Sequence, residues 1–184
     1  MTAPTPAYRI TAEPDEDDLR EVGGLGLWSV SSSKPNCGLK HLRDDDITTF
    51  WQSDATQPHS VSVQFPRLVS LMRISFYVSF AEDESYTPQE LSLYAGNNIN
   101  ELQEIGQLEL KKPAGWVNVP LHGADERSPL RTHVLQLMVR ANHQNGKDTH
   151  IRQIKVYSRA QYTAKEPGMA PYTSLEFLSH SCVR

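Results

Sequence analysis

Residues 71–80 read LMRISFYVSF, and this stretch decides the fold class. Its hydrophobic residues fall at every second position, at Met72, Ile74, Phe76, Val78 and Phe80. A period of two places successive side chains on opposite faces of an extended chain. The stretch therefore predicts a β-strand that has one face in the core and one face toward solvent.

The same alternation recurs on both sides of this stretch. It is found in residues 61–65, 91–95, 117–121, 135–141 and 154–156. Pro, Gly and Asn residues stand between these runs, where turns are expected. Many short strands separated by turns are typical of an antiparallel sandwich or barrel, so the chain is predicted to be an all-β protein.

Helical periodicity is scarce in this sequence. One short helix is expected after Gly38, lined by Leu39, Leu42 and Ile47, and a further helical turn is expected at residues 98–106. Indole rings in a β-sandwich mostly lie in the core or at its edge, with the N–H satisfied. The chain has three of them, Trp28, Trp51 and Trp116.

The two ends of the chain differ in composition from the middle. Residues 1–19 are rich in Pro, Thr and acidic residues, so they are predicted to form a disordered acidic arm. The alternation stops near residue 158, and residues 159–184 are predicted to be a linker followed by a docking tail. The last stretch is apolar enough to dock on a partner but too short to fold alone. The folded domain is therefore expected to span residues 20–158.

Charge and cysteine content exclude several classes of protein. The net charge is -4, and no basic run is present, so nucleic acid is not expected as a partner. No apolar stretch approaches the roughly 20 residues of a membrane span, so no membrane is expected either. Cys37 and Cys182 show neither a zinc-ligand spacing nor a disulfide framework, and no metal or cofactor is predicted. A nuclear or cytoplasmic protein with reduced thiols is the simple expectation.

Two segments between predicted strands are dense in polar side chains that form hydrogen bonds. The first segment contributes Ser53, Asp54, Gln57 and His59. The second segment contributes Asn142, His143, Gln144, Asn145, Asp148, Thr149 and His150. Binding sites are often built on such loops, and these side chains suit the reading of a peptide better than chemistry on a bond. In the alternative interpretation, Asn145 and Gly146 form a tight hairpin turn and the rest is solvated.

Some of the same residues could in principle support catalysis or bind a metal. Ser53 and Asp54, with His59 or His143, provide the residue types of a hydrolase, but no Gly-x-Ser-x-Gly elbow surrounds the serine. The histidines, including His150, match no metal-ligand spacing. The sequence therefore predicts a recognition protein rather than an enzyme.

Several nearly contiguous segments resemble one known family. They are LRDD at 42–45, FWQSD at 50–54, QPH at 57–59, DESYTP at 83–88 and ANHQNGKDTHIRQI at 141–154. Through them, most of the chain from residue 20 to residue 157 resembles the Doc-domain subunit of the anaphase-promoting complex, or cyclosome. The resemblance implies a galactose-binding-like, discoidin-like jelly-roll β-sandwich with short peripheral helices.

The resemblance also implies a function. Such subunits are not ligases themselves. They act with a coactivator propeller as co-receptor for the destruction-box degron of substrates, and they raise the processivity of ubiquitination in the cell cycle. The polar residues of the two segments would then face the degron, and the protein would be found in the nucleus and cytoplasm. A carbohydrate-binding module of the same fold is the alternative.

The end of the chain carries a further implication of the resemblance. Family members typically end in Ile-Arg, and that tail docks in a groove of a tetratricopeptide-repeat subunit. Here the chain ends in Val183 and Arg184. The terminal carboxylate and the guanidinium are still available for capture by a partner. Tetratricopeptide-repeat and scaffold subunits of the complex are therefore the expected partners.

Overall fold

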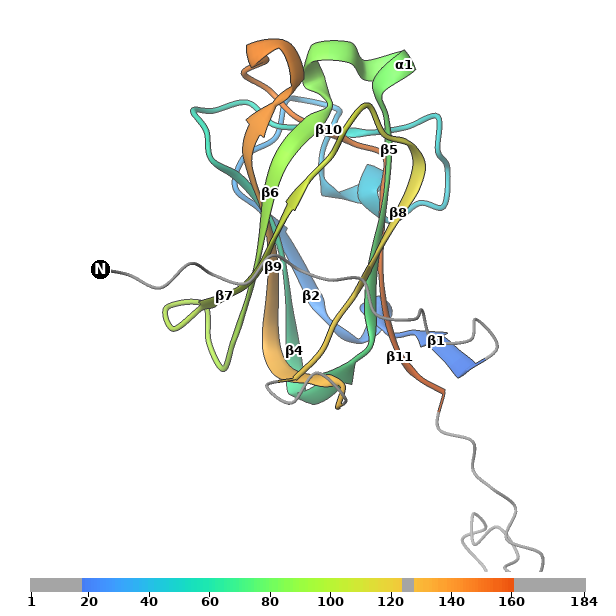
Figure 1. Cartoon of the computed structure of the whole chain (residues 1–184), viewed down its shortest axis with the longest axis vertical. Helices are drawn as coiled ribbons and strands as arrows, with labels where there is room; N and C mark the ends of the chain where they lie inside the picture. The colour runs from blue at the N-terminus through green and yellow to red at the C-terminus, as the bar shows by residue number, and fades with distance from the viewer. Residues whose placement is uncertain (1–17, 124–127, 161–184) are drawn as a thin grey trace, which may run out of the picture.

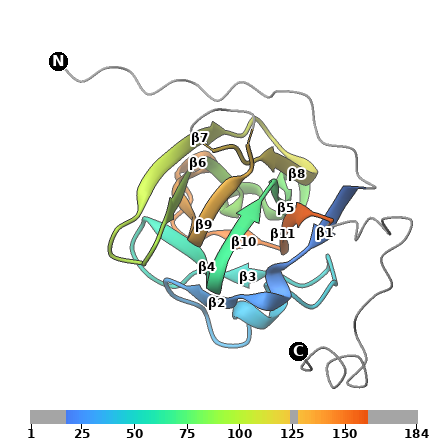
Figure 2. The same ribbon diagram turned by 90° about the horizontal axis from the view of Figure 1, so that it is seen from below.

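The computed structural model describes residues 18–123 and 128–160, which form two antiparallel sheets packed face to face (Figure 1). In spatial order, the four-stranded sheet contains β1 (Leu19–Glu21), β11 (Gln153–Arg159), β5 (Arg73–Ser79) and β8 (Ala114–Pro120). The five-stranded sheet contains β2 (Leu27–Val30), β4 (His59–Leu71), β9 (Leu130–Asn142), β6 (Pro88–Gly96) and β7 (Gln103–Glu109). Figure 2 shows the two sheets from below, on opposite sides of the core.

Short elements close the sandwich. A two-stranded sheet is formed by β3 (Trp51–Gln52) and β10 (His150–Ile151). The helical turns are α1 (Phe80–Asp83) and the 3-10 helices η2 (Gly23–Leu25), η3 (Leu39–Leu42), η4 (Glu84–Tyr86) and η5 (His143–Asn145). In Figure 1, α1 and β10 lie at the same end of the sandwich, which we call the loop end.

The core lies between the two sheets and follows the predicted alternation. On β5, Ile74, Phe76 and Val78 are buried, and on the facing sheet Leu91 and Leu93 of β6 are buried as well. Burying one such side chain stabilises the fold by about 1.5–3 kcal/mol. The predicted all-β sandwich is therefore confirmed, and its central strands are those that the alternation indicated.

Strand β5 differs from the prediction because both of its faces are buried. Its outward side chains Arg73 and Ser75 are only 6% and 2% exposed. The guanidinium of Arg73 lies 4.5 Å from the ring centroid of Tyr157 on β11, and Ser75 Oγ donates a 2.7 Å hydrogen bond to Asn118 Oδ1 on β8. Side chains of the two neighbouring strands thus cover the face that was expected to meet solvent.

The helical turn expected at residues 98–106 is wrong. This region contains the start of β7, which pairs with β6 through Leu93 and Gly106. A register shift between Leu93 and Tyr94 breaks the simple alternation there. The helix expected after Gly38 is present as the single turn η3, with Leu42 buried, but Ile47 lies outside it and is exposed.

The three tryptophans occupy different environments. Trp51 is fully buried and Trp28 is half-buried, and their indole N–H groups donate to the carbonyls of Ser32 and Gly23 at 2.9 Å and 2.8 Å. Trp116 is 42% exposed, so the expectation of a core-edge position is wrong for it. Its ring lies on the outer face of the four-stranded sheet, edge-on to Tyr77.

The first and last described strands pair with each other. Leu19 of β1 lies opposite Arg159 of β11, so the sheet extends one residue beyond each end of the expected domain, 20–158. The rest of the predicted arm and tail, including Val183 and Arg184, lies outside the described residues.

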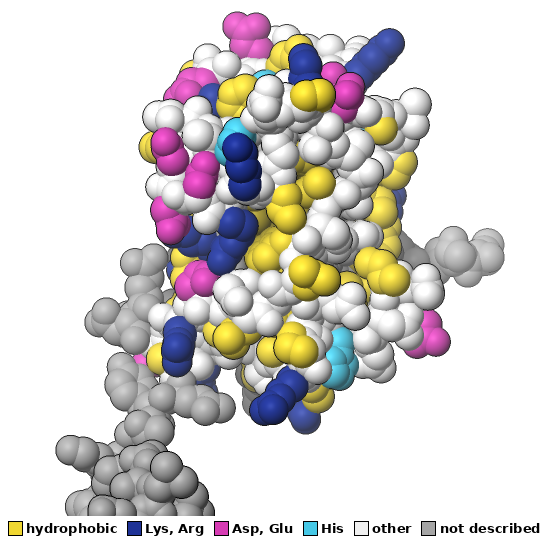
Figure 3. Space-filling view, turned by 180° about the vertical axis from the view of Figure 1, so that it is seen from behind, with side chains coloured by type: hydrophobic (Ala, Val, Ile, Leu, Met, Phe, Trp, Pro, Cys, Tyr) yellow, Lys and Arg dark blue, Asp and Glu magenta, His cyan; other side chains and the backbone are white. Residues whose placement is uncertain are grey.

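No helix in the described part of the chain is long and apolar enough to span a membrane. From behind, apolar side chains gather at the centre of the surface, and charged side chains lie mainly around its edges (Figure 3).

Candidate recognition site at the loop end

The two polar segments predicted from the sequence meet at the loop end. Strands β3 and β10 pair there, with Gln52 opposite His150. Just beyond this pair, the Ser53 N–H donates to the Thr149 carbonyl at 3.1 Å, and the Thr149 N–H donates to Ser53 Oγ at 2.8 Å. Segments almost 100 positions apart are thereby held side by side.

A second set of bonds joins the segments farther out. Gln57 Nε2 donates to the Gly146 carbonyl at 2.9 Å. The ring Nε2 of His59 lies 2.7 Å from the Lys147 carbonyl, which accepts its hydrogen. The two loops are therefore held together by hydrogen bonds at the loop end.

Burial divides the eleven predicted site residues into two groups. Six are buried, namely Ser53, His59, Asn142, His143, Thr149 and His150. Five are exposed or half-buried, namely Asp54, Gln57, Gln144, Asn145 and Asp148. The expectation that all eleven face a ligand is therefore reduced to five, because the buried side chains are turned toward the protein and shape the loops.

Asn142 shows how a buried amide shapes the second loop. Its Nδ2 donates to the Asp148 carbonyl at 2.7 Å, and its Oδ1 accepts from Thr149 Oγ1 at 2.8 Å. Leaving such a buried group without a partner costs about 1–3 kcal/mol. The amide thus links the start of this loop to its end.

The exposed tip of this loop has an unusual backbone. Gln144 and Asn145 both have positive φ angles, 54° and 56°, whereas Gly146 has a φ of -60°. The turn is therefore shifted one residue from the tight hairpin of Asn145 and Gly146 that the alternative interpretation expected. A Cβ atom on Gly146 would lie 1.7 Å from the Ser85 carbonyl oxygen, so only glycine allows this approach to η4.

Beneath the loops, His150 lies in an aromatic stack. Its imidazole lies between Phe50 and Tyr86, with ring centroids 4.1 Å and 4.2 Å away. Its Nδ1 lies 3.0 Å from Oδ1 of Asp83, and the carboxylate of Asp83 also accepts two 2.9 Å hydrogen bonds from Arg152. Neither Asp83 nor Arg152 was assigned a role from the sequence, although both fall within the segments that carry the family resemblance.

Opposite charge keeps this buried pair ionised. Burial disfavours the carboxylate of Asp83, but hydrogen bonds from His150 and Arg152 outweigh it and hold the pKa of Asp83 below its usual value. Burial likewise acts against the Arg152 guanidinium, and bonding to Asp83 raises the pKa of Arg152 despite it. The charges are thus fixed in place under the loop end.

The geometry does not support the hydrolase or metal interpretations. The Ser53 hydroxyl accepts a hydrogen bond from the Thr149 N–H, whereas the ring of His59 is bonded to the Lys147 carbonyl and the ring of His143 packs edge-on against Phe80. Neither histidine is thus placed to activate the serine. Within residues 18–123 and 128–160, no group of three His, Cys, Asp or Glu side chains could hold a metal ion.

Comparison with known proteins identifies the family. The family model described as anaphase-promoting complex, subunit 10 (APC10) matches residues 5–182. The chain belongs to the APC10 family. It is therefore a subunit of the anaphase-promoting complex, and the resemblance noted in the sequence is confirmed.

Relatives within the APC10 family match along most of the chain. Anaphase-promoting complex subunit 10 of Homo sapiens is 45% identical over 167 residues, which cover 90% of this chain and 89% of the human protein. The Schizosaccharomyces pombe subunit is 38% identical over 168 residues, which cover 89% and 87% of the two chains. Subunit DOC1 of Saccharomyces cerevisiae is 33% identical over 144 residues, which cover 78% of this chain and 58% of the yeast protein.

Solved structures relate the fold of this APC10-family chain to carbohydrate-binding modules. A family 32 module from Clostridium perfringens NanJ, in complex with galactose, gives a TM-score of 0.63 at 13% identity and covers 76% of this chain and 99% of that chain. The paired modules of Clostridium perfringens ZmpB give 0.67 at 16% identity and cover 86% and 42%. At such low identity the likeness shows the fold alone. The predicted galactose-binding-like fold is thereby confirmed.

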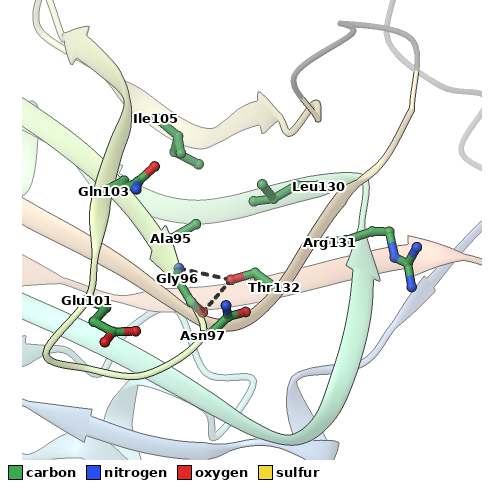
Figure 4. Close-up of a pocket in the computed structure, with 9 residues that line it drawn as sticks. All are labelled: Ala95, Gly96, Asn97, Glu101, Gln103, Ile105, Leu130, Arg131 and Thr132. Carbon is green, nitrogen blue, oxygen red and sulfur yellow. Dashed lines mark hydrogen bonds between the residues drawn. The ribbon is translucent and has the colours of Figure 1, made fainter.

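This APC10-family chain also has a cavity at the end opposite the loops. The position follows from the pairing of β6 with β9, since Pro88 lies opposite Asn142 at the loop end and Gly96 lies opposite Val134 far from it. The cavity has a volume of about 440 Å³ (Figure 4). Thr132 Oγ1 accepts from the Gly96 N–H at 3.1 Å in its wall, so the nearby backbone is already satisfied. None of the predicted site residues lines this cavity.

Proposed function

We propose that this subunit is a non-catalytic co-receptor, which binds the destruction-box degron of substrates together with a coactivator propeller. The observation that supports the proposal is the set of five accessible polar side chains on two loops that are hydrogen-bonded to each other. Because the loops are fixed by buried residues, little conformational entropy is lost when a short peptide binds.

The chemistry of the five side chains suits an extended peptide. The amides of Gln57, Gln144 and Asn145 can each donate to a peptide carbonyl and accept from a peptide N–H. The carboxylates of Asp54 and Asp148 attract basic side chains of the degron. These groups read a linear signal without requiring a deep pocket.

Two weak surfaces that share one degron explain the expected effect on processivity. Once the propeller holds one part of the peptide, binding of the other part to the loop end becomes nearly intramolecular. The gain appears mainly as slower release of the substrate. A longer residence time permits more ubiquitin transfers before the substrate leaves.

The proposal is tested with the double variant Asn145→Gly/Asp148→Asn. Glycine accepts the positive φ of residue 145, and asparagine keeps the size of residue 148, so both changes remove ligand contacts without straining the loop. Each lost hydrogen bond is worth about 1–1.5 kcal/mol, so the loss of two should weaken binding about 30-fold to 160-fold. In a reconstituted ligase, crosslinking of a destruction-box peptide should require the coactivator and should fall accordingly, and ubiquitin chains should shorten.

The matched control changes similar residue types at the far end of the sandwich. Asn100→Gly/Glu101→Gln alters exposed positions beside the opposite cavity and should leave degron crosslinking unchanged. If the loop-end variant ubiquitinates substrates as well as the native chain does, the site assignment is wrong. If both variants are equally impaired, the loop end has no special part in recognition.

The carbohydrate alternative is separated by a direct test. Family 32 modules share the fold, and Tyr86 exposes its ring at the loop end, although one face is stacked on His150. The proposed function expects no signal on a glycan array from the purified chain. A glycan that binds at the loop end and is lost in the same double variant would support the alternative instead.

Location follows from the proposed function. A subunit that helps to select cell-cycle substrates is expected in both the nucleus and the cytoplasm. A fluorescent fusion of the full chain that is confined to one membrane-bounded organelle would contradict this expectation.

A further inference from the structure

The outer face of the four-stranded sheet carries a row of aromatic and basic side chains. They are Arg73 of β5, Trp116 of β8, and Lys155, Tyr157 and Arg159 of β11. Each alternates with core residues of its own strand, so each points away from the core. We call these five residues the aromatic–basic face.

This face is hollowed rather than flat. A cavity of about 210 Å³ lies on it, lined by Arg73, Trp116 and Tyr157 together with Ser75 and Asn118. The ammonium group of Lys155 lies 5.6 Å from the Trp116 ring centroid. An exposed indole beside a cavity and two cations is a surface suited to an acidic segment.

Positive charge on the face is only partly compensated. Lys155 Nζ pairs with Asp45 Oδ1 at 2.7 Å, but this aspartate is 74% exposed. No acidic partner of Arg159 is found among residues 18–123 and 128–160. An acidic chain passing over this face would therefore be attracted to it.

The chain itself supplies such a segment at the edge of the same sheet. Strand β1 is the edge strand beside β11, and the carbonyl of Asp18 accepts a 2.6 Å hydrogen bond from the Ala160 N–H. The five residues that precede this point read Glu13-Pro14-Asp15-Glu16-Asp17. The acidic run thus immediately precedes Asp18, which is bonded to the residue after Arg159.

The distances permit the run to reach the face. Neighbouring strands lie about 4.8 Å apart and residues along a strand about 3.3 Å apart, so Lys155, one strand across from β1 and four residues from Arg159, is roughly 14 Å away. Five extended residues span up to roughly 17 Å. A run that turns back at Asp18 therefore reaches Lys155 and the edge of the cavity.

We propose that residues 13–17 fold back over the aromatic–basic face and place their carboxylates beside Arg159, Lys155 and the cavity next to Trp116. The arm then acts as a built-in acidic ligand of this face. An acidic segment of a neighbouring subunit would have to displace it. Because the pairs are near the surface, the contact weakens as the salt concentration rises.

The three tryptophans provide a direct test in the full chain. The indole N–H groups of Trp28 and Trp51 are hydrogen-bonded inside the protein and serve as internal references. In the variant Asp15→Asn/Glu16→Gln/Asp17→Asn, the indole NMR signal of Trp116 should move while the two reference signals stay. The Trp116 signal is assigned by its loss in Trp116→Phe.

A control variant carries the same loss of charge on the other sheet. Glu90→Gln/Glu101→Gln/Glu109→Gln neutralises three exposed residues of β6, β7 and the turn between them. The Trp116 signal should remain at its native position in this variant. In the native chain, 1 M NaCl, where the screening length is about 3 Å, should move the signal toward that of the arm variant.

Carbodiimide crosslinking gives a second, independent readout. Lys155 should couple to carboxylates within residues 13–17 as well as to Asp45, its partner in the structure. The Asp45 crosslink confirms that Lys155 is reactive, and it should become more abundant in the arm variant.

Three outcomes would overturn the proposal. The first is a Trp116 signal that is identical in the native chain and the arm variant. The second is an acidic run that crosslinks to Lys34 or Lys147 as readily as to Lys155. The third is a Trp116 signal that moves only when an external acidic peptide is added, because the face would then belong to a partner.

Discussion

The imidazole of His150 is held on three sides, by the rings of Phe50 and Tyr86 and by the carboxylate of Asp83. It is 8% exposed, so its main contribution is to fix the chain on which the accessible Asp148 stands two residues earlier. A change at a buried residue should therefore alter recognition through the shape of the loop. His150 differs in this respect from Asn145, whose exposed side chain can touch a ligand directly.

Asp83→Ala should be among the more damaging single changes in the described chain. It leaves Arg152 and His150 buried without their shared acceptor, and breaking such a buried pair costs about 3–5 kcal/mol. Glu82→Ala is the matched control, because Glu82 also contacts Arg152, at 2.9 Å, but from a 58% exposed position. Exposed pairs contribute about 0–1 kcal/mol. Urea denaturation should show a large loss of unfolding free energy for the first variant only, and similar losses for both would contradict the assignment.

The same carboxylate predicts a dependence of stability on pH. Its pKa is lowered in the folded protein from an ordinary value of about 3.9, so the unfolded chain takes up this proton at a higher pH than the folded one. The stabilisation is therefore fully present above about pH 5 and is lost as the pH falls through about 4 and below. Asp83→Asn should flatten this part of the curve of unfolding free energy against pH. An unchanged slope would show that other carboxyl groups account for it.

At the scale of elements, the connection from β9 to β10 depends on its contact with η4. Gly146→Ala would drive a Cβ atom into the Ser85 carbonyl and force the two segments apart. Overpacking of this kind costs about 1–3 kcal/mol. Gly24→Ala is the control, since a Cβ atom at Gly24 would meet nothing within 4 Å. Thermal stability and degron crosslinking should both fall in the first variant, and neither should change in the second.

The elements that could be predicted from the sequence are those whose own side chains build the core. Strands β4, β5, β6, β8, β9 and β11 carry that alternation. The four shortest strands, β1, β2, β3 and β10, have only two to four residues. Strands β1 and β2 are extended because each pairs with the edge of a longer strand, and β3 and β10 are extended because they pair with each other. The start of edge strand β7 is mistaken for helix because its residues alternate poorly and many of them face solvent. The local sequence of these short or exposed strands does not show which neighbouring strand they pair with.

The candidate site was predictable to a similar degree. The density of polar residues indicated both loops, and the family resemblance predicted that they form one site. The sequence did not show that His59 and Thr149 are fully buried, because the orientation of a loop side chain depends on partners almost 100 positions away. Nor did it connect Asp83 with His150, since those residues meet only when α1 and β10 reach the same end of the sandwich.

At the scale of the whole molecule, the direction of β11 places the end of the described chain away from the loop end. This strand starts beside β10 at the loop end and ends at Arg159 at the other end of the sandwich (Figure 1). The described part of the chain therefore ends far from the loop end. A subunit tethered by its C-terminus would therefore leave the loop end accessible to a coactivator and its substrate.

This arrangement predicts that the end of the chain governs assembly and not folding. Deleting Val183 and Arg184 should weaken co-purification with the tetratricopeptide-repeat subunit, because it removes the guanidinium and moves the terminal carboxylate. The unfolding temperature of the isolated chain should stay the same, since the last described strand ends at Arg159. Val183→Ile restores the usual family ending and adds one methylene, worth up to about 0.8 kcal/mol or roughly fourfold in affinity when buried. A truncated chain that assembles normally would refute the role of the tail, whereas a tighter Ile variant would show that this residue enters an apolar groove.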